Sequence, residues 1–330
     1  MSIRDKVALK VSVIITTHSE QRLPRLKNIL EGLASQTYPH GEVVVVGNGV
    51  TGLEHSYLNM WANDAENRKF LPYSDNAWSW SDHSTIGRFR YHAGIQHSSG
   101  DLIFCQSDDD HVACDFFERI VNLFETNADC MTAIGLPVDY YYEDNRVIFP
   151  KDGGWCSRPR FMHGKDLVLN WIEDRSFHPN PGFCFVCRRS LFVEAGEDIW
   201  YGYDTSILLS LVPKGITGFD PEALMYWGRS NAQAHIELDD YHYQKLVYVK
   251  QLSKRNQLML NVWTSVGTKV ELRMLRTFQK HELANYSAKG MLYAVKTKNL
   301  QLAFRHLRVG GFLAIIFAVF REMRMKFRKC

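Results

Sequence analysis

The sequence lacks the features that define several protein classes. It has only 10 prolines and 22 glycines in 330 residues, and it shows no internal repeat. Collagen-like, low-complexity and repeat architectures are therefore excluded. Its seven cysteines are odd in number and sparse, so no disulfide framework is expected. No signal peptide precedes the first apolar run, which predicts a reducing, cytoplasmic location.

The chain also lacks an apolar run long enough to cross a bilayer. The longest, Phe312–Phe320, is far shorter than the roughly 20 residues that a span needs. Residues 251–330 hold 16 Lys and Arg against 3 Asp and Glu, whereas residues 1–250 hold 23 against 33. This asymmetry predicts a basic extension that lies on an anionic membrane surface or, alternatively, packs on the body. No nucleic-acid motif accompanies the charge, so no nucleic-acid partner is expected.

Strand and helix signals alternate through the first 135 residues. Buried-strand runs at 11–16, 42–46 and 102–106 are separated by segments with helical periodicity at 23–36, 53–62, 86–97 and 116–125. Such alternation predicts an α/β fold with a parallel sheet and helices on both faces. Residues 139–144 are expected to be a loop. We predict one domain over residues 1–240 and a helical C-terminal extension over residues 241–330.

The chemistry is expected where the parallel strands end. Ligands of such sheets bind beyond the carboxyl ends of the strands, here near residues 16–20, 47–52 and 107–110. Three adjacent carboxylates, Asp108, Asp109 and Asp110, repel one another, and a divalent cation relieves that repulsion. In an extended segment Asp108 and Asp110 would share one face. We therefore predict a Mg²⁺ or Mn²⁺ site there; the alternative is an acidic loop before the helix at Phe116.

A glycine pattern offers a different interpretation. Residues Gly47–Gly52 read Gly-Asn-Gly-Val-Thr-Gly, which matches the dinucleotide-binding pattern after a strand. The pattern follows the second predicted strand, not the first, which favours a plain glycine-rich turn. Asn48 is kept as a candidate contact to a nucleotide base or ribose.

Longer stretches resemble a known family. Residues 11–20, VSVIITTHSE, resemble the opening strand of family 2 glycosyltransferases of the GT-A fold. The segment with Gln36-Thr37-Tyr38, the segment ending in the three aspartates, and EDIWYGYDTSILLSL at 197–211 resemble later motifs of that family. The resemblance covers residues 11–125 and, more loosely, 180–230. It implies a nucleotide-sugar-binding half over residues 1–135 and an acceptor half over residues 136–240.

The resemblance implies roles for individual residues. Asp108 would contact ribose or metal and Asp110 the metal and diphosphate, while Asp109 remains in the set because the acidic run can align one residue off. The remaining nucleotide-sugar contacts implied are Thr17, Ser19, Glu20, Arg88 and Arg90. Many members also carry a histidine that reaches the metal. Here Trp227-Gly228-Arg229-Ser230 stands in that stretch, so His235 and Arg229 are the candidates.

Inverting transfer requires a general base for the acceptor hydroxyl. The resemblance assigns this role to Asp204, with Glu197 and Asp198 in reserve; the alternative is that Asp204 only caps the following helix. The family's aspartate that contacts uracil is replaced here by Gly47 or Asn48. This departure weakens the assignment of UDP as the donor nucleotide. UDP stays the first to consider, and GDP and dTDP remain open.

The resemblance implies a metal-dependent, inverting, non-processive glycosyltransferase. Its donor would be a nucleoside-diphosphate sugar and its acceptor a glycan or lipid-linked hydroxyl, in cell-surface polysaccharide synthesis at the inner face of the membrane. Two alternatives stay open. One is an NAD(P)-dependent oxidoreductase that uses Gly47–Gly52, and the other is a non-catalytic binding protein on a degenerate GT-A fold.

Overall fold

The computed structural model describes residues 8–18, 20–73, 86–150, 158–173, 185–196, 199, 209–229 and 247–310. The chain divides into two compact units, Met1–Asn231 and Ala232–Cys330. Each unit is described by itself below.

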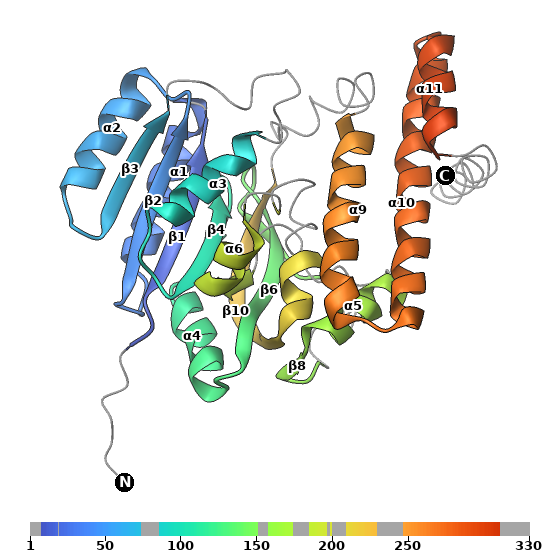
Figure 1. Ribbon diagram of the computed structural model, residues 1–330. Helices are drawn as coiled ribbons and strands as arrows, with labels where there is room; N and C mark the ends of the chain where they lie inside the picture. Colours follow the sequence, from blue (N-terminus) through green and yellow to red (C-terminus); the bar gives the residue numbers. More distant parts are fainter. Residues whose placement is uncertain are drawn as a thin grey trace. The chain divides into compact units, whose positions relative to one another are not determined.

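The first unit is built on one mixed sheet, shown in Figure 1. In the described residues the strand order is β3-β2-β1-β4-β9-β6-β10-β5, with β7 added beside β6 and β8 beside β10. The strands β1, β2, β3 and β4 are parallel, β6 and β10 are also parallel to each other, and β9 runs antiparallel between β4 and β6. The strand bounds are β1 Val11–Thr17, β2 Gly41–Asn48, β3 Arg68–Tyr73, β4 Leu102–Ser107, β5 His111–Val112, β6 Cys130–Tyr141, β7 Arg146–Ile148, β8 Phe161–His163, β9 Phe185–Arg188 and β10 Ile216–Arg229.

Helices cover both faces of the sheet. In β1, Val11 and Val13 share a cavity wall with Leu30 of α1 (Leu23–Ala34). On the opposite face, Ile14 lies against Gly94 of α3 (Ile86–Gln96). Since neighbouring side chains of a strand point to opposite faces, α1 and α3 sandwich β1. The other helices of this unit are α2 Gly52–Asn63, α4 Phe116–Thr126, α5 Gly164–Glu173 and α6 Arg189–Ala195.

The core forms where apolar periodicity meets the sheet. Every residue of β1 is buried, as its β-branched sequence predicts for a central strand. The helix α4, which the sequence predicted at 116–125, buries six of its residues, including Phe116 and Phe124. This packing holds the carboxyl ends of β1 and β4 in fixed positions beside each other.

Several strands were not predicted from the sequence, among them β3, β6 and β10. Residues Asp139–Tyr141 belong to β6, so the loop expected at 139–144 begins only after Tyr141. The strand β6 is buried from Thr132 to Val138 because β9 and β10 lie on its two sides. Its apolar run is interrupted by Gly135 and Pro137, which weakens the strand signal in the sequence.

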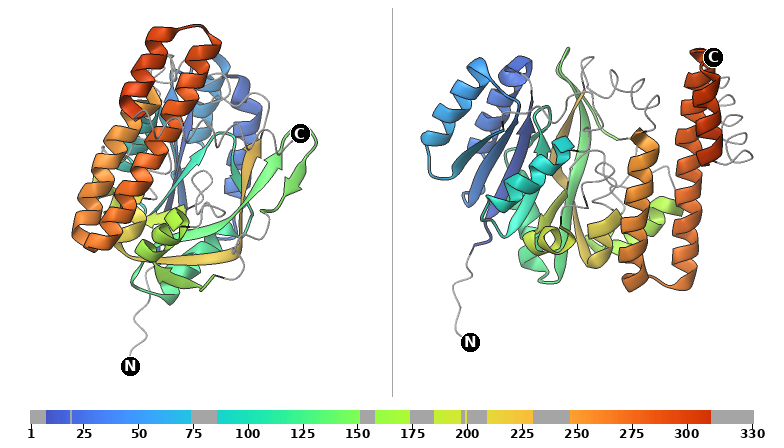
Figure 2. Two further views of the ribbon diagram at one scale, coloured as in Figure 1. Left: turned by 90° about the vertical axis from the view of Figure 1, so that its right-hand side faces the viewer. Right: turned by 45° about the horizontal axis from the view of Figure 1, so that its top comes forward.

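The second unit is helical over its described residues (Figure 2). It contains α9 Val247–Val266, α10 Lys269–Lys296 and α11 Leu300–Gly310. Thr268 and Glu271 form a capping box at the start of α10. Leu302 and Ala303 of α11 pack on Ala294 of α10. Among the helices that the structure describes, none combines the length and apolar content that a membrane crossing requires.

Candidate functional site

The three aspartates form a tight turn directly after β4. The amide nitrogen of Asp110 donates to the carbonyl of Ser107 at 3.4 Å, which closes the turn. The expectation that this segment is extended was therefore wrong. Instead Asp108 points to Arg22 and Asp110 to β10, so the turn is held from two sides. We call Asp108–Asp110 the acidic turn.

Arg22 is the main counter-ion of the acidic turn. Its guanidinium forms an ion pair with Asp108 Oδ1 and lies 3.5 Å from Asp109 Oδ2. The Arg22 side chain is 16% exposed and that of Asp108 is 3% exposed, so water screens this pair little. Burial lowers the pKa of Arg22, but the charges of Asp108 and Asp109 outweigh burial and raise it above its ordinary value.

The other side of the turn is fixed by backbone contacts. The amide of Gly228 in β10 donates to Asp110 Oδ1 at 2.9 Å. The hydroxyl of Tyr142 donates to the carbonyl of Asp109 at 2.6 Å, and the guanidinium of Arg25 stacks on the Tyr142 ring. Residues from α1, β10 and the end of β6 therefore converge on one turn.

Burial and the charges of the acidic turn shift the pKa values of Asp109 and His18. Burial and the charge of Asp108 raise the pKa of Asp109 to about 6, against the opposing charges of Arg22 and Arg25. Burial lowers the pKa of His18, although the charge of Asp108 works against burial. Three adjacent carboxylates, with the guanidiniums of Arg22 and Arg25 as the opposing charges, leave the turn short of positive charge.

The end of β1 contributes a second group of polar side chains. Thr17 Oγ1 donates to Glu54 Oε1 at 2.6 Å, and both residues are fully buried. Burial raises the pKa of Glu54, and the charges of Asp108 and Glu20 add to this effect, while the hydrogen bond from Thr17 lowers it. The structure therefore brings Thr17 and Glu54 into the electrostatic environment of the acidic turn.

Glu20 has a structural partner that affects the dinucleotide alternative. Its Oε1 accepts from the amide of Leu53 at 2.8 Å, in the first turn of α2. In a dinucleotide fold the pyrophosphate occupies this helix N-terminus. Here a carboxylate already lies there, and Gly52, with φ +60°, provides the turn that brings the helix onto it. The glycine pattern therefore serves chain geometry in this structure.

Polar and aromatic side chains come together at the carboxyl ends of β2 and β3. Asn48 is fully buried, and its Oδ1 accepts from Arg90 Nε at 3.4 Å. The guanidinium of Arg90 lies 3.8 Å from the centre of the Tyr73 ring. Asn48 and Arg90, both candidates from the sequence, are thus brought together.

The acidic turn fits a divalent cation that takes only one or two of its ligands from these carboxylates. Asp108 Oδ2 is buried, and nothing in the described part of the chain hydrogen-bonds to it. Within the same residues, no three His, Cys, Asp or Glu side chains surround a common point as a preformed metal site. A cation bound by one or two carboxylates, with phosphate oxygens and water completing its shell, matches this arrangement and the habit of Mg²⁺.

Among the remaining sequence candidates, Arg229 can be placed and the others cannot. Arg229 is described: its Nε donates to Asp139 Oδ1 at 2.8 Å, and its guanidinium stacks on Trp227. It therefore lies on the strand neighbouring the turn, paired with an acid of β6. The remaining candidates lie outside the described residues or, for Arg88, have an undescribed side chain: Ser19, Arg88, Glu197, Asp198, Asp204 and His235.

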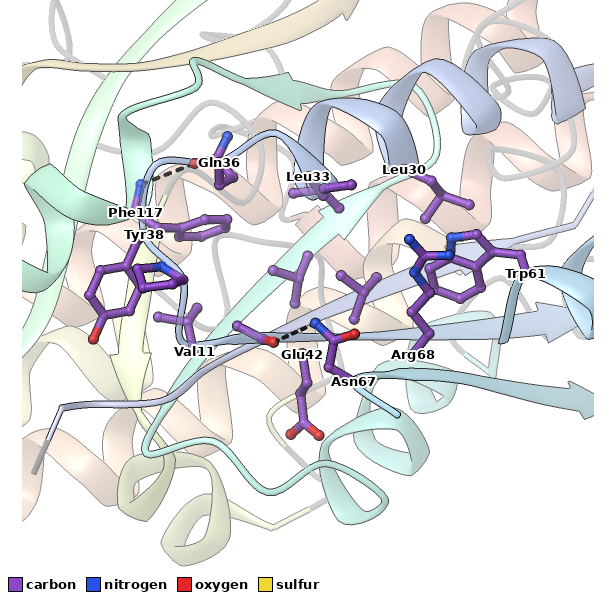
Figure 3. A pocket seen from close by; sticks show the side chains of 15 residues that line it. Val11, Leu30, Leu33, Gln36, Tyr38, Glu42, Trp61, Asn67, Arg68 and Phe117 are labelled. Atoms are coloured by element: carbon purple, nitrogen blue, oxygen red, sulfur yellow. Dashed lines mark hydrogen bonds between the residues drawn. The ribbon is translucent and has the colours of Figure 1, made fainter. Parts of the chain in front are cut away.

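Two cavities can be compared with this site. One, of about 190 Å³, lies at the opposite edge of the sheet, where Val11, Gly41 and Arg68 begin β1, β2 and β3. Figure 3 shows it between Tyr38 at one end and the Trp61–Arg68 pair at the other. The other, of about 150 Å³, lies behind the acidic turn. Its wall includes Gln106, His111, Tyr140 and Tyr142.

Side chains in the wall of the second cavity contact the acidic turn and the strand that follows it. Gln106 is fully buried, and its Nε2 donates to the carbonyl of Asp110. His111 stacks on Tyr226, with ring centres 4.6 Å apart, and burial lowers its pKa to about 4. His111 is the first residue of β5 and directly follows the acidic turn.

Sequence reasoning missed Arg22, Glu54 and Gly228. Arg22 lies two residues after Glu20 and Glu54 two residues after Gly52, so both were within reach of the strand-end rule that selected their neighbours. Gly228 was quoted only as part of the stretch around Arg229. Its importance depends on the pairing of β10 with β6, which the sequence pattern did not indicate.

Comparisons with known proteins give a consistent result. No protein-family model matches the chain. A curated relative, the glucosyl-dolichyl phosphate glucuronosyltransferase of Haloferax volcanii, is 25% identical over 201 residues, which are 60% of this chain. The match spans 57% of that relative's length.

Solved structures of TarS from S. aureus have a similar fold. Residues 1–349 of TarS match with a TM-score of 0.52 and 12% identity, covering 89% of each chain. The same fragment in complex with UDP-GlcNAc matches with a TM-score of 0.52 and 13% identity, again over 89% of each chain. The α/β fold class and the resemblance to GT-A glycosyltransferases that the sequence predicted are both confirmed.

Proposed function

We propose that this chain, which has the fold of the GT-A glycosyltransferases, transfers a sugar from a nucleoside-diphosphate sugar to a glycan or lipid-linked hydroxyl. The observation that carries the proposal is the acidic turn. It lies at the carboxyl edge of the parallel strands, held between Arg22 and Gly228, with a buried oxygen of Asp108 left for a ligand. Further polar groups lie at the carboxyl ends of β1 and β2.

The donor would lie along this edge. Asn48 and Arg90 are the proposed contacts to base or ribose, and Thr17, Ser19, Glu20 and Arg88 complete the proposed nucleotide set. The diphosphate would face the acidic turn through a Mn²⁺ or Mg²⁺ ion held by Asp108 and Asp110, with Asp109 beside them and His235 as a further proposed ligand. A cation in that position stabilises the charge that develops on the leaving diphosphate.

The acceptor side is proposed from the family resemblance. Asp204 would take the proton of the acceptor hydroxyl as its oxygen attacks the anomeric carbon, which inverts the configuration there. We further propose that the basic second unit brings the enzyme to an anionic membrane surface on the cytoplasmic side, where lipid-linked acceptors are found. Cell-surface polysaccharide synthesis is the corresponding process.

A thermal-shift panel tests the donor site. The full chain is melted with UDP, GDP, dTDP and NAD⁺, each with and without Mn²⁺, because a ligand of the native state raises the melting temperature. UDP is tested first, since a TarS structure contains UDP-GlcNAc. We expect one nucleoside diphosphate to stabilise the chain only with Mn²⁺. Asp110→Asn should remove this shift, and Asp64→Asn, at an exposed position, should retain it.

Two outcomes would contradict the proposal. Stabilisation by NAD⁺ without metal would favour the oxidoreductase, although Glu20 lies where its pyrophosphate would bind. No shift with any compound would favour a non-catalytic binding protein. Release of the nucleoside diphosphate from the matching sugar donor, measured over time, then separates binding from catalysis.

A further inference from the structure

The contact between Arg22 and the acidic turn has a consequence for how a cation enters. The side chain of Arg22 is largely buried. Its guanidinium forms an ion pair with Asp108 and lies 3.5 Å from the carboxylate of Asp109. It is positioned by the 3₁₀ turn Glu20–Arg22, which connects the end of β1 to α1. Both ends of the pair are therefore fixed to the sheet.

The two oxygens of Asp108 are used differently. Oδ1 is occupied by Arg22, while Oδ2 is buried without a hydrogen-bond partner among the described residues. A divalent cation bound at Oδ2 would sit only a few ångströms from a guanidinium that cannot lose its proton. Two like charges at such a distance in a poorly screened site repel each other strongly.

We propose that Arg22 is the resting counter-ion of the acidic turn, so that a bare divalent cation must compete with its guanidinium for Asp108. This inference rests on the proposed metal site and adds a residue that controls it. The guanidinium stabilises the carboxylates when no cation is bound. A diphosphate that arrives with the cation gives the guanidinium a second anionic partner, since Arg binds phosphate oxygens in a bidentate manner. Cation and diphosphate are then taken up together.

The charges around the acidic turn distinguish two roles for Arg22: competing with the cation for Asp108, or only orienting Asp108. They favour competition. If Arg22 only oriented Asp108, its removal would weaken cation binding. Removal also leaves three carboxylates with one fewer positive charge, and an uncompensated buried carboxylate is strongly destabilised. Relief of that repulsion by a divalent cation is the larger effect. Removing the charge of Arg22 should therefore tighten the binding of a bare cation.

The test measures Mn²⁺ alone, without nucleotide. Free Mn²⁺ is counted by electron paramagnetic resonance during titration of the full-length chain. We expect Arg22→Gln to bind Mn²⁺ about tenfold or more tightly than the unaltered chain. Arg22→Lys keeps the positive charge and should bind Mn²⁺ as weakly as the unaltered chain. Arg68→Gln, which removes an equal charge at the opposite edge of the sheet, is the matched control and should also behave as the unaltered chain.

The outcomes separate this inference from the proposed function. Equal Mn²⁺ affinity of Arg22→Gln and the unaltered chain, with binding lost in Asp110→Asn, would overturn the role of Arg22 and leave the metal site standing. Absence of Mn²⁺ binding in every variant, Arg22→Gln included, would overturn both. Far-ultraviolet circular dichroism and a thermal melt of each variant show that it is folded. If the glutamine variant unfolds, Arg22→Met carries the test, because it also removes the charge and should also tighten Mn²⁺ binding.

Discussion

Gly228 packs its α-carbon against the inner side of the acidic turn. A β-carbon there would overlap the carbonyl oxygen of Asp109 and lie 2.7 Å from the ring of Tyr142. The neighbours on one side are backbone atoms, so they cannot move aside as a flexible side chain would. The hydrogen bond from Gly228 to Asp110 depends on this close approach.

Gly228→Ala should therefore damage the site more than the fold. We expect a loss of about 1–3 kcal/mol in the free energy of unfolding, typical of overpacking, and loss of the Mn²⁺-dependent nucleotide shift. Urea denaturation and the thermal-shift panel measure the two effects. Gly32→Ala is the control, because nothing lies within 4 Å of its added β-carbon and it is inside α1. Retained nucleotide binding in Gly228→Ala would show that the turn does not need this contact.

Asp204 is predicted to act on the acceptor and not on the donor. Asp204→Asn removes the proton acceptor while keeping shape, so the nucleotide-dependent thermal shift should persist. Donor turnover should fall by at least about 100-fold, within the usual range for a general base. Release of nucleoside diphosphate from the donor, with water or glycan as acceptor, gives the rate. If turnover survives, Glu197→Gln and Asp198→Asn are tested as the reserve candidates.

Single site residues could be predicted from the sequence where they lie at the end of a buried strand run. Thr17, Asn48 and the acidic turn follow directly from buried strand runs, and the structure places them at one edge. Arg22 and Gly228 depend on contacts between segments 86 and 118 residues apart, which a local pattern does not contain. The extended geometry expected for Asp108–Asp110 failed because hydrogen bonds from Gln106, Tyr142 and Gly228 hold a turn there.

At the scale of elements, Glu42 connects the parallel strands at the edge opposite the site. Its buried carboxylate accepts from Ser12 of β1 at 2.6 Å and from the amides of Ser99 and Gly100 before β4. Lys69 of β3 donates to it at 3.2 Å. One side chain of β2 therefore bonds to β1, to β3 and to the segment that leads into β4.

This cluster predicts how stability depends on pH. Burial raises the pKa of Glu42, but the hydrogen bonds from Ser12, Ser99, Lys10 and Lys69 outweigh burial and bring it to about 2, from an ordinary value of 4.5. The unfolded chain therefore takes up this proton first as the pH falls. The contribution of Glu42, about 3 kcal/mol, should be fully present above pH 4.5 and disappear towards pH 2.

Glu42→Gln should lower the free energy of unfolding at neutral pH and flatten its decline below pH 4.5. Urea denaturation at a series of pH values measures both. Glu31→Gln, on the exposed face of α1, is the control and should leave the acid limb unchanged. A Glu42→Gln curve parallel to that of the unaltered chain would contradict the assignment.

Elements could be predicted where buried residues form an uninterrupted apolar run, and they were missed where the run is broken or burial is irregular. The predicted strands at 11–16, 42–46 and 102–106 correspond to β1, β2 and β4, whose residues are almost all buried. By contrast, β3 has no buried residue, and β10 alternates irregularly through a register shift between Phe219 and Leu224. A periodicity argument needs regular burial, which these two strands lack.

At the scale of the whole molecule, charge is divided unevenly between the two ends of the sequence. The basic excess of residues 251–330 contrasts with the acidic excess before them. In α11, Leu302 and His306 are buried, while Leu300 and Phe304 are about 70% exposed and Arg305 and Arg308 are also exposed. Exposed apolar and basic side chains on one short helix are typical of a surface that contacts anionic lipid.

We expect the full-length chain to sediment with vesicles that contain phosphatidylserine at low ionic strength. It should remain in solution with pure phosphatidylcholine. Since surface electrostatics are screened within about 10 Å at 0.1 M salt and within about 3 Å at 1 M, high salt should release it. Reversing Arg305 and Arg308 to Glu should weaken binding, and reversing Arg68 and Arg119 in the first unit should not. Vesicle binding that does not depend on lipid charge, on salt or on which arginine pair is reversed would contradict this prediction. The basic unit would then serve protein contacts instead.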